Sequence, residues 1–530
     1  MNIISKIILS ALLCAFSLNV SSQTLKRQGN ATQLIINGKP MLILGGEVSN
    51  SAATSVKDIE EWMPRMKEMG LNTVLVPAYW EFIEPTEGHF DFTLTDKVIA
   101  EAKKNDLKVV FLWFGAWKNS MSCYAPSWFK TDTKRFPRSM TRSGKPLEIA
   151  SVFSDNVFNA DCKAFTTWLR HTKNVSNGTV IMIQIENEIG MLEDARDYSP
   201  EAQEEFAKWK GKDTGLDNDE RFMATHYARY VEKMAQAARK IWDIPFYVNA
   251  AMNSRGRKPG EYPSAGPLAH LMDIWKKEAP TVDFMAPDIY DTGFASWASQ
   301  YATDNNPLFI PETKCCENSG VRALYTFGEY EALGFSPFAI DQTSKEISDN
   351  IRDTYGLLKQ LSPLFFNYQG KGAMHGLLFD QENKERVIDD DGIKIIARHN
   401  FTLPWDPRAT DGSVWPEGGG LIIRLSPLEY IVAGNGIVVE FKTEKEYEQT
   451  TDQKLGEDGF AEKGNGEKGK AKTSFKGKRL GFLSVDQVNI SNDGSIVYLR
   501  RDNGDQDHQG RHARIGVGEQ KILHVKLYEY

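Results

Sequence analysis

Cysteine is scarce in this sequence, which has five among its 530 residues. Four of them follow the first 22 residues, and their spacings match no metal-binding or redox motif. Two of these four, Cys315 and Cys316, are adjacent, and adjacent cysteines rarely bridge each other. This pattern argues against a scaffold built on disulfides, and we expect neither a metal nor an organic cofactor.

Long apolar runs are also scarce, and the acidic residues (71) outnumber the basic ones (63). The formal net charge is −8, which argues against nucleic acid or an anionic membrane as the partner. Beyond the N-terminus no apolar stretch approaches the ~20 residues of a membrane-spanning helix, so we expect no stable membrane insertion. Trp, by contrast, occurs 12 times, and Trp side chains that are not needed in a core can stack on sugars. Nothing in the sequence specifies an oligomeric state.

The first 22 residues have the pattern of a secretory signal peptide. Lys6 supplies the positive charge, residues 7–18 the apolar core, and Val20-Ser21-Ser22 the small residues of a cleavage site. Leu13 precedes Cys14 where a lipoprotein signal has a small residue, so we expect cleavage rather than lipid attachment. The protein is therefore expected to be exported, either to the periplasm or to the outside of the cell.

Residues 23–371 alternate between strand-like and helix-like segments, which is the pattern of a parallel sheet covered by helices. Eight segments have the composition of buried strands, and eight parallel strands joined by helices close into a (β/α)8 TIM barrel. The first strand is expected at Met41–Leu44. The eight strands are expected to begin at Met41, Thr73, Lys108, Val180, Phe246, Phe284, Leu308 and Phe335.

Residues 372–530 have a different pattern of apolar and turn residues. Short apolar runs are separated by Gly, Asp and Asn turns and lack a helical period, which predicts a C-terminal β-sandwich. The chain is therefore expected to divide into a signal peptide (1–22), a catalytic barrel (23–371) and an accessory β-domain (372–530). Residues 443–479 are rich in Lys, Glu and Gly, which predicts a solvated mobile loop between two strands.

The most informative stretch runs from Ile181 to Gly190, where an apolar strand ends in two carboxylates and an amide. This strand is the fourth of the predicted barrel, and Glu186, Asn187 and Glu188 follow it, whereas Glu312 ends the seventh strand. TIM barrels carry their catalytic groups at the C-terminal ends of the strands. The alternatives are a strand end whose acids simply face water and, for Glu312, a structural salt bridge at the barrel rim.

Two carboxylates on opposite sides of a barrel mouth suit glycoside cleavage. One protonates the departing oxygen and the other attacks the anomeric carbon, and a separation of about 5–5.5 Å gives retention through a covalent intermediate. The acid needs a raised pKa, which burial and a neighbouring carboxylate supply, whereas the nucleophile must stay ionised. Tyr290, at the end of the sixth strand, either donates a hydrogen bond to Glu312 or is an ordinary rim aromatic.

Three motifs add to this interpretation. They are Gly45-Gly46-Glu47, residues 80–92 (Trp-Glu-Phe-Ile-Glu-Pro-Thr-Glu-Gly-His-Phe-Asp-Phe) and Gln184-Ile185-Glu186-Asn187-Glu188 followed by Ile189-Gly190. The last of them resembles the Gln-x-Glu-Asn-Glu-x-Gly signature of glycoside hydrolase family 35, the β-galactosidases of clan A. The other two are similar to the segments that end the first strand and follow the second in that family. The resemblance extends over about residues 33–361.

The resemblance implies a role for each matched residue. Glu188 corresponds to the acid/base, Glu312 to the nucleophile, and Asn187 to the amide that bonds the sugar 2-hydroxyl. Glu186 is expected to anchor its loop rather than to react, because it precedes the matched acid by two residues.

Two departures from the family pattern bear on the identity of the sugar. The family commonly ends its third strand in Ala-Glu-Trp, whose Glu binds galactose, whereas this chain has Ala116-Trp117-Lys118-Asn119. A family Tyr that precedes the second-strand Trp is replaced here by Pro77. Lys118, Asn119 and Glu81 are candidates to substitute for the missing groups. The candidate substrate-binding residues are therefore Glu47, Trp80, Trp117, Lys118, Asn119, Asn187 and Tyr290.

The expected function is that of an exported, retaining exo-glycosidase that removes terminal β-D-galactose from plant oligo- or polysaccharides, so its partner is a carbohydrate. The first alternative is another clan A hydrolase, such as a β-mannosidase or an endo-glucanase. The remaining alternatives are a catalytically inactive carbohydrate-binding barrel and a structural surface protein. Neither of these would require both carboxylates together with the matching asparagine.

Overall fold

The computed structural model describes residues 23–530 apart from 212, 254–255, 404, 451–476 and 505–509. The predicted signal peptide, residues 1–22, lies outside these residues, as does most of the loop predicted at 443–479. The first residues of that predicted loop are not a loop, because β19 (Ile437–Thr443) is followed by a short helix, α12 (Glu444–Thr450). None of the helices in the described part of the chain has the length and apolar character needed to cross a membrane.

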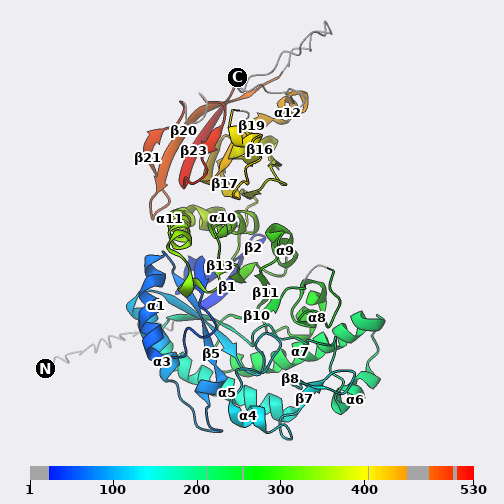
Figure 1. Cartoon of the computed structure of the whole chain (residues 1–530). Coiled ribbons are helices and arrows are strands. Elements are labelled where there is room, and N and C mark those ends of the chain that lie inside the picture. The colour runs from blue at the N-terminus through cyan, green and yellow to red at the C-terminus, as the bar shows by residue number, and fades with distance from the viewer. Residues whose placement is uncertain (1–22, 212, 254–255, 404, 451–476, 505–509) are drawn as a thin grey trace, which may run out of the picture.

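Eight parallel strands close into a barrel in chain order, which confirms the predicted TIM barrel (Figure 1). Nearly all of their residues are buried, since the strands face side chains on the inside and helices on the outside. The barrel strands are β4 (Ile43–Glu47), β5 (Thr73–Tyr79), β6 (Lys108–Phe114), β9 (Val180–Gln184), β10 (Phe246–Ala251), β11 (Phe284–Ile289), β12 (Phe309–Thr313) and β13 (Gly334–Pro337).

Each barrel strand is followed by a helix that covers the outside of the barrel. These helices are α1 (Val56–Glu68), α3 (Thr93–Lys104), α5 (Asp155–Ser176), α7 (Gly215–Arg239), α8 (Met272–Glu278), α9 (Phe294–Tyr301), α10 (Ser319–Tyr330) and α11 (Lys345–Tyr368). The connections after the strands also hold α2 (Trp80–Ile83), α4 (Ser127–Thr131), the hairpin β7 (Arg138–Met140) and β8 (Pro146–Ala150), α6 (Pro200–Lys208), η1 (Ala269–Leu271) and η2 (Ile340–Gln342).

The predicted first barrel strand is wrong in its boundaries. A three-stranded antiparallel sheet, β1 (Gln23–Gln28), β2 (Ala31–Ile36) and β3 (Lys39–Met41), precedes the barrel, and β4 begins only at Ile43. The cause is the turn at Asn37 and Gly38, where φ values of 51° and 79° form a tight hairpin that pairs Met41 with Leu34.

The end of β4 is shaped by close packing. A Cβ atom on Gly45 would lie 2.2 Å from the Ser336 hydroxyl oxygen of the neighbouring strand β13, so only glycine fits there. This close approach continues past the strands as a parallel bridge between Glu47 and Phe338. Glu47 is thereby held inside the barrel mouth.

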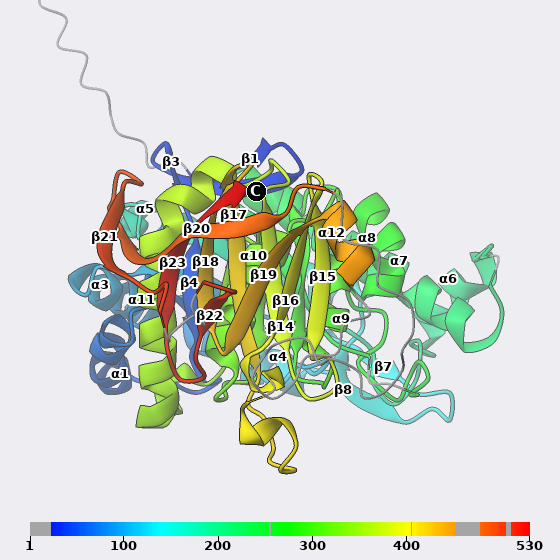
Figure 2. The same ribbon diagram turned by 90° about the horizontal axis from the view of Figure 1, so that it is seen from above.

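Two antiparallel sheets follow the barrel, which confirms the predicted C-terminal β-sandwich (Figures 1 and 2). The six-stranded sheet has the order β14 (Met374–Phe379), β17 (Gly418–Ser426), β18 (Glu429–Asn435), β23 (Lys521–Glu529), β20 (Leu480–Ile490) and β21 (Ile496–Arg501). The four-stranded sheet has the order β15 (Glu385–Asp390), β16 (Ile393–His399), β19 and β22 (Ala513–Ile515), and η3 (Asn400–Thr402) and η4 (Pro407–Ala409) lie in the connection after β16.

The central strands of the six-stranded sheet are buried on both faces, whereas the edge strand β21 is largely exposed. On one face, residues such as Ile423 and Ile431 belong to the same apolar core as the barrel helices, and Figure 1 shows α10 and α11 beneath this sheet. On the other face, Ile422 and Val432 pack with the four-stranded sheet. A continuous core therefore joins the sandwich to the barrel.

Candidate active site

Polar side chains from five barrel strands meet at the mouth where the C-terminal ends of the strands lie. Because all the strands of the barrel are parallel, groups that are far apart in the sequence end at this one face. The ionisable groups brought together are Glu47 from β4, Lys118 after β6, Glu188 after β9, Asp288 from β11 and Glu312 from β12. Each of these side chains belongs to a residue that is at most 6% exposed.

Glu188 is fixed by contacts from two neighbouring strands. The Asn119 amide donates a hydrogen bond of 2.5 Å to the Glu188 carboxylate, and the backbone N–H of Glu188 donates to the Asn249 side-chain oxygen at 2.9 Å. Glu188 has a φ of 47°, which is unfavourable for a side chain with a Cβ atom. These contacts aim the carboxyl group into the mouth.

Glu312 lies between a tyrosine and a second glutamate. The Tyr290 hydroxyl donates a hydrogen bond to the Glu312 carboxylate, which is the first of the two alternatives that the sequence leaves open. Glu47 interacts with the same carboxylate. Burial, followed by the charge of Glu312, raises the pKa of Glu47 well above its usual value, which makes Glu47 the protonated member of this pair.

Asp288 is a further carboxyl group that the sequence reasoning missed. It lies beside Glu312 in the register of β11 and β12, it accepts a hydrogen bond of 2.6 Å from the Asn249 amide, and it is in hydrogen-bond contact with Glu188. Burial and then the charge of Glu312 raise its pKa well above the usual value. Asp288 and Asn249 follow the same rule as the predicted residues, being polar side chains at the end of an apolar strand, and that signal could have found them.

Lys118 is the cation recorded among these carboxyl groups. Its ammonium is buried and lies 5.0 Å from the centre of the Phe114 ring, and no direct ion pair to it is recorded among the described residues. Burial lowers its pKa, but the surrounding carboxylates, Glu312 first, outweigh burial and raise the pKa overall. The ammonium is therefore charged and keeps unused donors that face the mouth.

Asn187 is completely buried, and within the described residues neither its amide nitrogen nor its side-chain oxygen has a hydrogen-bond partner. A buried amide without partners is costly, so such groups indicate a ligand that completes their bonding. A parallel bridge between Lys118 and Asn187 places both residues on the same side of the mouth. The role that the resemblance gives Asn187, binding of the sugar 2-hydroxyl, stays a prediction.

Two of the predicted sugar-binding residues do not reach the mouth. Trp80 is fully buried, donates its indole N–H to Glu84 at 3.0 Å and packs against Trp128. Trp117 is also fully buried, and its ring packs edge-on against tyrosines of α7. Both predictions were wrong because the indole rings pack into the core, one against Trp128 and the other against tyrosines of α7, and so present no ring face at the mouth. Of the other predicted residues, Glu47, Lys118, Asn119, Asn187 and Tyr290 line the mouth.

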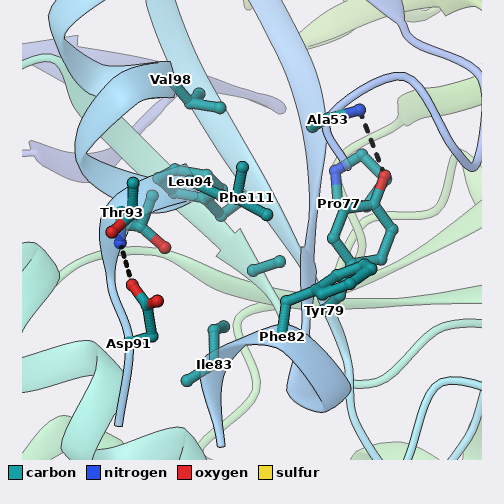
Figure 3. Close-up of a pocket in the computed structure, with 12 residues that line it drawn as sticks. Ala53, Pro77, Tyr79, Phe82, Ile83, Asp91, Thr93, Leu94, Val98 and Phe111 are labelled. Carbon is teal, nitrogen blue, oxygen red and sulfur yellow. Dashed lines mark hydrogen bonds between the residues drawn. The ribbon is translucent and has the colours of Figure 1, made fainter. Parts of the chain in front are cut away.

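A small cavity of about 100 Å³ lies beside the barrel between β5, α2 and α3 (Figure 3). It is lined mainly by apolar side chains, and the Tyr79 hydroxyl in its wall accepts a hydrogen bond from the Ala53 backbone N–H. Its lining includes none of the converging carboxyl groups, so it is separate from the candidate site.

Comparison with known protein families gives two matches. Residues 51–250 match the family model described as "Beta-galactosidase" (Glyco_hydro_42), and residues 351–514 match a domain of unknown function, DUF5597. The first match supports the predicted relationship to β-galactosidases. The family that matches is glycoside hydrolase family 42, however, and not family 35. Assignment to family 35 stays a prediction.

Two curated proteins are similar over shorter stretches. A β-galactosidase of Xanthomonas manihotis is 28% identical over 190 residues, which are 33% of this chain and 28% of the relative. An endo-1,4-beta-xylanase of Naganishia albida is 76% identical over 25 residues, which are 5% of this chain and 8% of the relative. The chain thus matches less than a third of the length of either relative.

Among solved structures, β-galactosidases from Bacillus circulans sp. alkalophilus and Rahnella sp. R3 are similar to this chain. The TM-score is 0.46 in both cases, with 13% and 15% identity, and the match covers 60% and 61% of this chain and 56% and 57% of the relatives.

Proposed function

We propose that this protein is a retaining exo-glycosidase that hydrolyses terminal β-D-galactosyl residues of plant oligo- or polysaccharides outside the cytoplasm. The observation that carries the proposal is the pair formed by Glu188 and Glu312, two buried carboxyl groups that interact across the barrel mouth. The match of residues 51–250 to a β-galactosidase family model supports galactose as the sugar.

In this mechanism Glu312 attacks the anomeric carbon while Glu188 protonates the departing oxygen. Water then attacks the galactosyl-enzyme, and Glu188, now ionised, removes its proton. The donors on Tyr290 and Lys118 stabilise charge on the nucleophile, and Asn187 binds the sugar beside the anomeric carbon. Near-complete burial of the carboxyl groups favours a pocket that accepts a chain end, which supports exo action.

The test is hydrolysis of aryl β-galactoside, glucoside, mannoside, fucoside, arabinoside and xyloside by the wild-type protein. The galactoside is expected to be the preferred substrate, and NMR is expected to show β-galactose as the first product, because double displacement retains configuration. Release of galactose alone from a galactan, without oligosaccharides, would support exo action. A different preferred glycoside, or α-galactose as the first product, would contradict the proposal.

The pH dependence follows from Glu188. Burial and the charge of Glu312 raise its pKa to about 7, and the acid must be protonated when the substrate binds. We therefore expect kcat/KM to be level just below pH 7 and to fall about tenfold per pH unit above it. A pH profile of kcat/KM on an aryl β-galactoside measures this limb directly. A limb near pH 4.5 would contradict a proton donor in this environment.

Replacing Lys118 by Met removes the buried cation of the site. We expect kcat/KM to fall by about 10- to 100-fold, since a charge-assisted hydrogen bond contributes roughly 1.5–3 kcal/mol. The alkaline limb should also move to higher pH, because Lys118 lowers the pKa of Glu188. Lys130→Met is the matched control, because Lys130 lies 3.9 Å from the partly exposed Glu81 rather than in the mouth. An unchanged limb in Lys118→Met would place the ammonium outside the site.

A further inference from the structure

A second pair of carboxyl groups, which the proposed mechanism does not use, lies beneath the mouth. Glu186 is in the loop after β9, two residues before the acid/base, and Asp161 is in the first turns of α5. Both side chains are completely buried. The two carboxyl groups are in hydrogen-bond contact with each other. Carboxyl groups in contact away from water cannot both be ionised, so the pair holds a proton.

The surrounding donors decide which of the two carries this proton. One oxygen of Asp161 accepts the indole N–H of Trp113 at 2.9 Å, and the other accepts the hydroxyl of Tyr230 at 2.7 Å. Both oxygens of Asp161 therefore act as acceptors. Glu186 accepts the backbone N–H of Trp117 at 2.8 Å on Oε2 and also interacts with the backbone N–H of Ala116, whereas its Oε1 accepts no side-chain donor within the described residues.

We propose that Glu186 is the neutral donor and Asp161 the anion of a buried proton-sharing pair, which fastens the loop carrying Asn187 and Glu188 to α5, β6 and α7. Glu186 and Glu188 have φ values of 56° and 47°, so the loop adopts a conformation that it would not hold without an anchor. The chain leaves room for the pair, because a Cβ atom on Gly115 would lie 2.7 Å from Asp161 Oδ1.

The electrostatics agree with this assignment. Burial, and then the charge of Asp161, raise the pKa of Glu186 well above its usual value. The pKa of Asp161 is raised as well, because burial outweighs the hydrogen bonds from Glu186, Tyr230 and Trp113, which act to lower it. The titratable groups that face the pair are Tyr230 from α7 and, next to that tyrosine, Cys162 from α5; the interactions recorded for the described residues include no cation.

The assignment predicts an unequal response to two amide substitutions. In Glu186→Gln the amide N–H₂ can replace the carboxyl proton and donate to Asp161, while the amide oxygen still accepts from Trp117. In Asp161→Asn an N–H₂ group must face the Trp113 or Tyr230 donor. We expect Glu186→Gln to keep kcat/KM within threefold of wild type at pH 6, and Asp161→Asn to lose more than tenfold. This comparison of kcat/KM values rests on the proposed function.

Thermal unfolding tests the pair without any assay of activity. Because the folded pKa of Glu186 is raised, its stabilising contribution is full below the unfolded pKa and is lost as pH rises towards the folded pKa. Glutamine cannot ionise, so the Tm of Glu186→Gln minus that of wild type should increase from pH 5 to pH 9. The matched control is Glu84→Gln, because buried Glu84 accepts N–H groups on both oxygens, at 3.0 and 2.7 Å, and its Tm should fall.

Several outcomes would overturn the proposal. The first is a Tm difference between Glu186→Gln and wild type that does not change with pH. The second is wild-type kcat/KM in Asp161→Asn together with a large loss of kcat/KM in Glu186→Gln. The third is a folded Glu186→Gln whose activity is as low as that of Glu188→Gln. If Asp161→Asn does not fold, Tyr230→Phe removes one donor to Asp161 and should still melt below Glu186→Gln. A wild-type protein without glycosidase activity would refute the proposed function and leave the Tm result standing.

Discussion

Glu312→Gln is expected to lower kcat on an aryl β-galactoside by about 10⁴-fold or more, since loss of the nucleophile in a covalent mechanism costs up to the order of 10⁶-fold in a well-studied hydrolase. The amide cannot attack the anomeric carbon, and no leaving group, however good, compensates for that loss. The fold should survive, because glutamine occupies the same volume and its amide oxygen can still accept the hydrogen bond from Tyr290. Initial rates and a melting curve of the same preparation separate the two effects.

A shorter side chain gives a stricter test of the nucleophile. In Glu312→Gly a small anion such as azide can occupy the space that the carboxylate leaves and attack the sugar from the same side, so the product should be α-galactosyl azide. The matched control is Glu317→Gln, an exposed glutamate in the loop after the same strand, which should keep wild-type rates. Retention of more than a few per cent of activity in Glu312→Gln would assign the nucleophile to another group.

The barrel could be predicted from the sequence because burial on both faces leaves a simple pattern. Strands such as Val180–Gln184 are continuous apolar runs that end abruptly in polar residues, and in a parallel barrel such ends meet at one face. That argument alone brings together Glu188 and Glu312, which lie 124 positions apart in the numbering. The same argument applies to Asn249 and Asp288, although neither belongs to a motif that resembles the family.

Side-chain direction within loops could not be predicted in the same way. Trp117 lies three residues after the end of β6, and its ring turns outwards to α7 whereas Lys118, the next residue, turns into the mouth. Asn119 and Ser120 have positive φ values of 51° and 56°, so the chain after β6 has no regular period from which directions could be inferred. Trp80 belongs to the short helix after β5, where contacts with Trp128 and Phe129 fix the ring in the core.

The pairing of carboxyl groups could not be predicted from the sequence either. The contacts of Glu47 with Glu312, of Asp288 with Glu188 and of Glu186 with Asp161 join elements that are distant along the chain. Motif positions identify which residues are present, but a shared proton depends on burial and on the other donors around each oxygen. The anchoring role predicted for Glu186 agrees with its contacts, whereas the partner that makes it an anchor, Asp161, lies in no motif.

Glu188→Gln is expected to produce a loss that depends on the leaving group. For galactosides with alkyl or sugar leaving groups, kcat/KM should fall by about 10²- to 10⁴-fold, because these oxygens need a proton as they depart. For a dinitrophenyl galactoside, whose leaving group departs as a stable anion, formation of the galactosyl-enzyme should proceed at nearly the wild-type rate. A plot of log kcat/KM against leaving-group pKa should therefore be much steeper for the variant than for the wild type.

The same substitution slows the second step, because Glu188 must then activate water. With the dinitrophenyl substrate the galactosyl-enzyme should accumulate, which gives a burst of product followed by a slow phase, and azide should accelerate the slow phase with β-galactosyl azide as product. This product is the opposite anomer to that expected from Glu312→Gly, because azide attacks the free substrate in one case and the covalent intermediate in the other. If both variants gave the same anomer, the roles assigned to Glu188 and Glu312 could not both be correct.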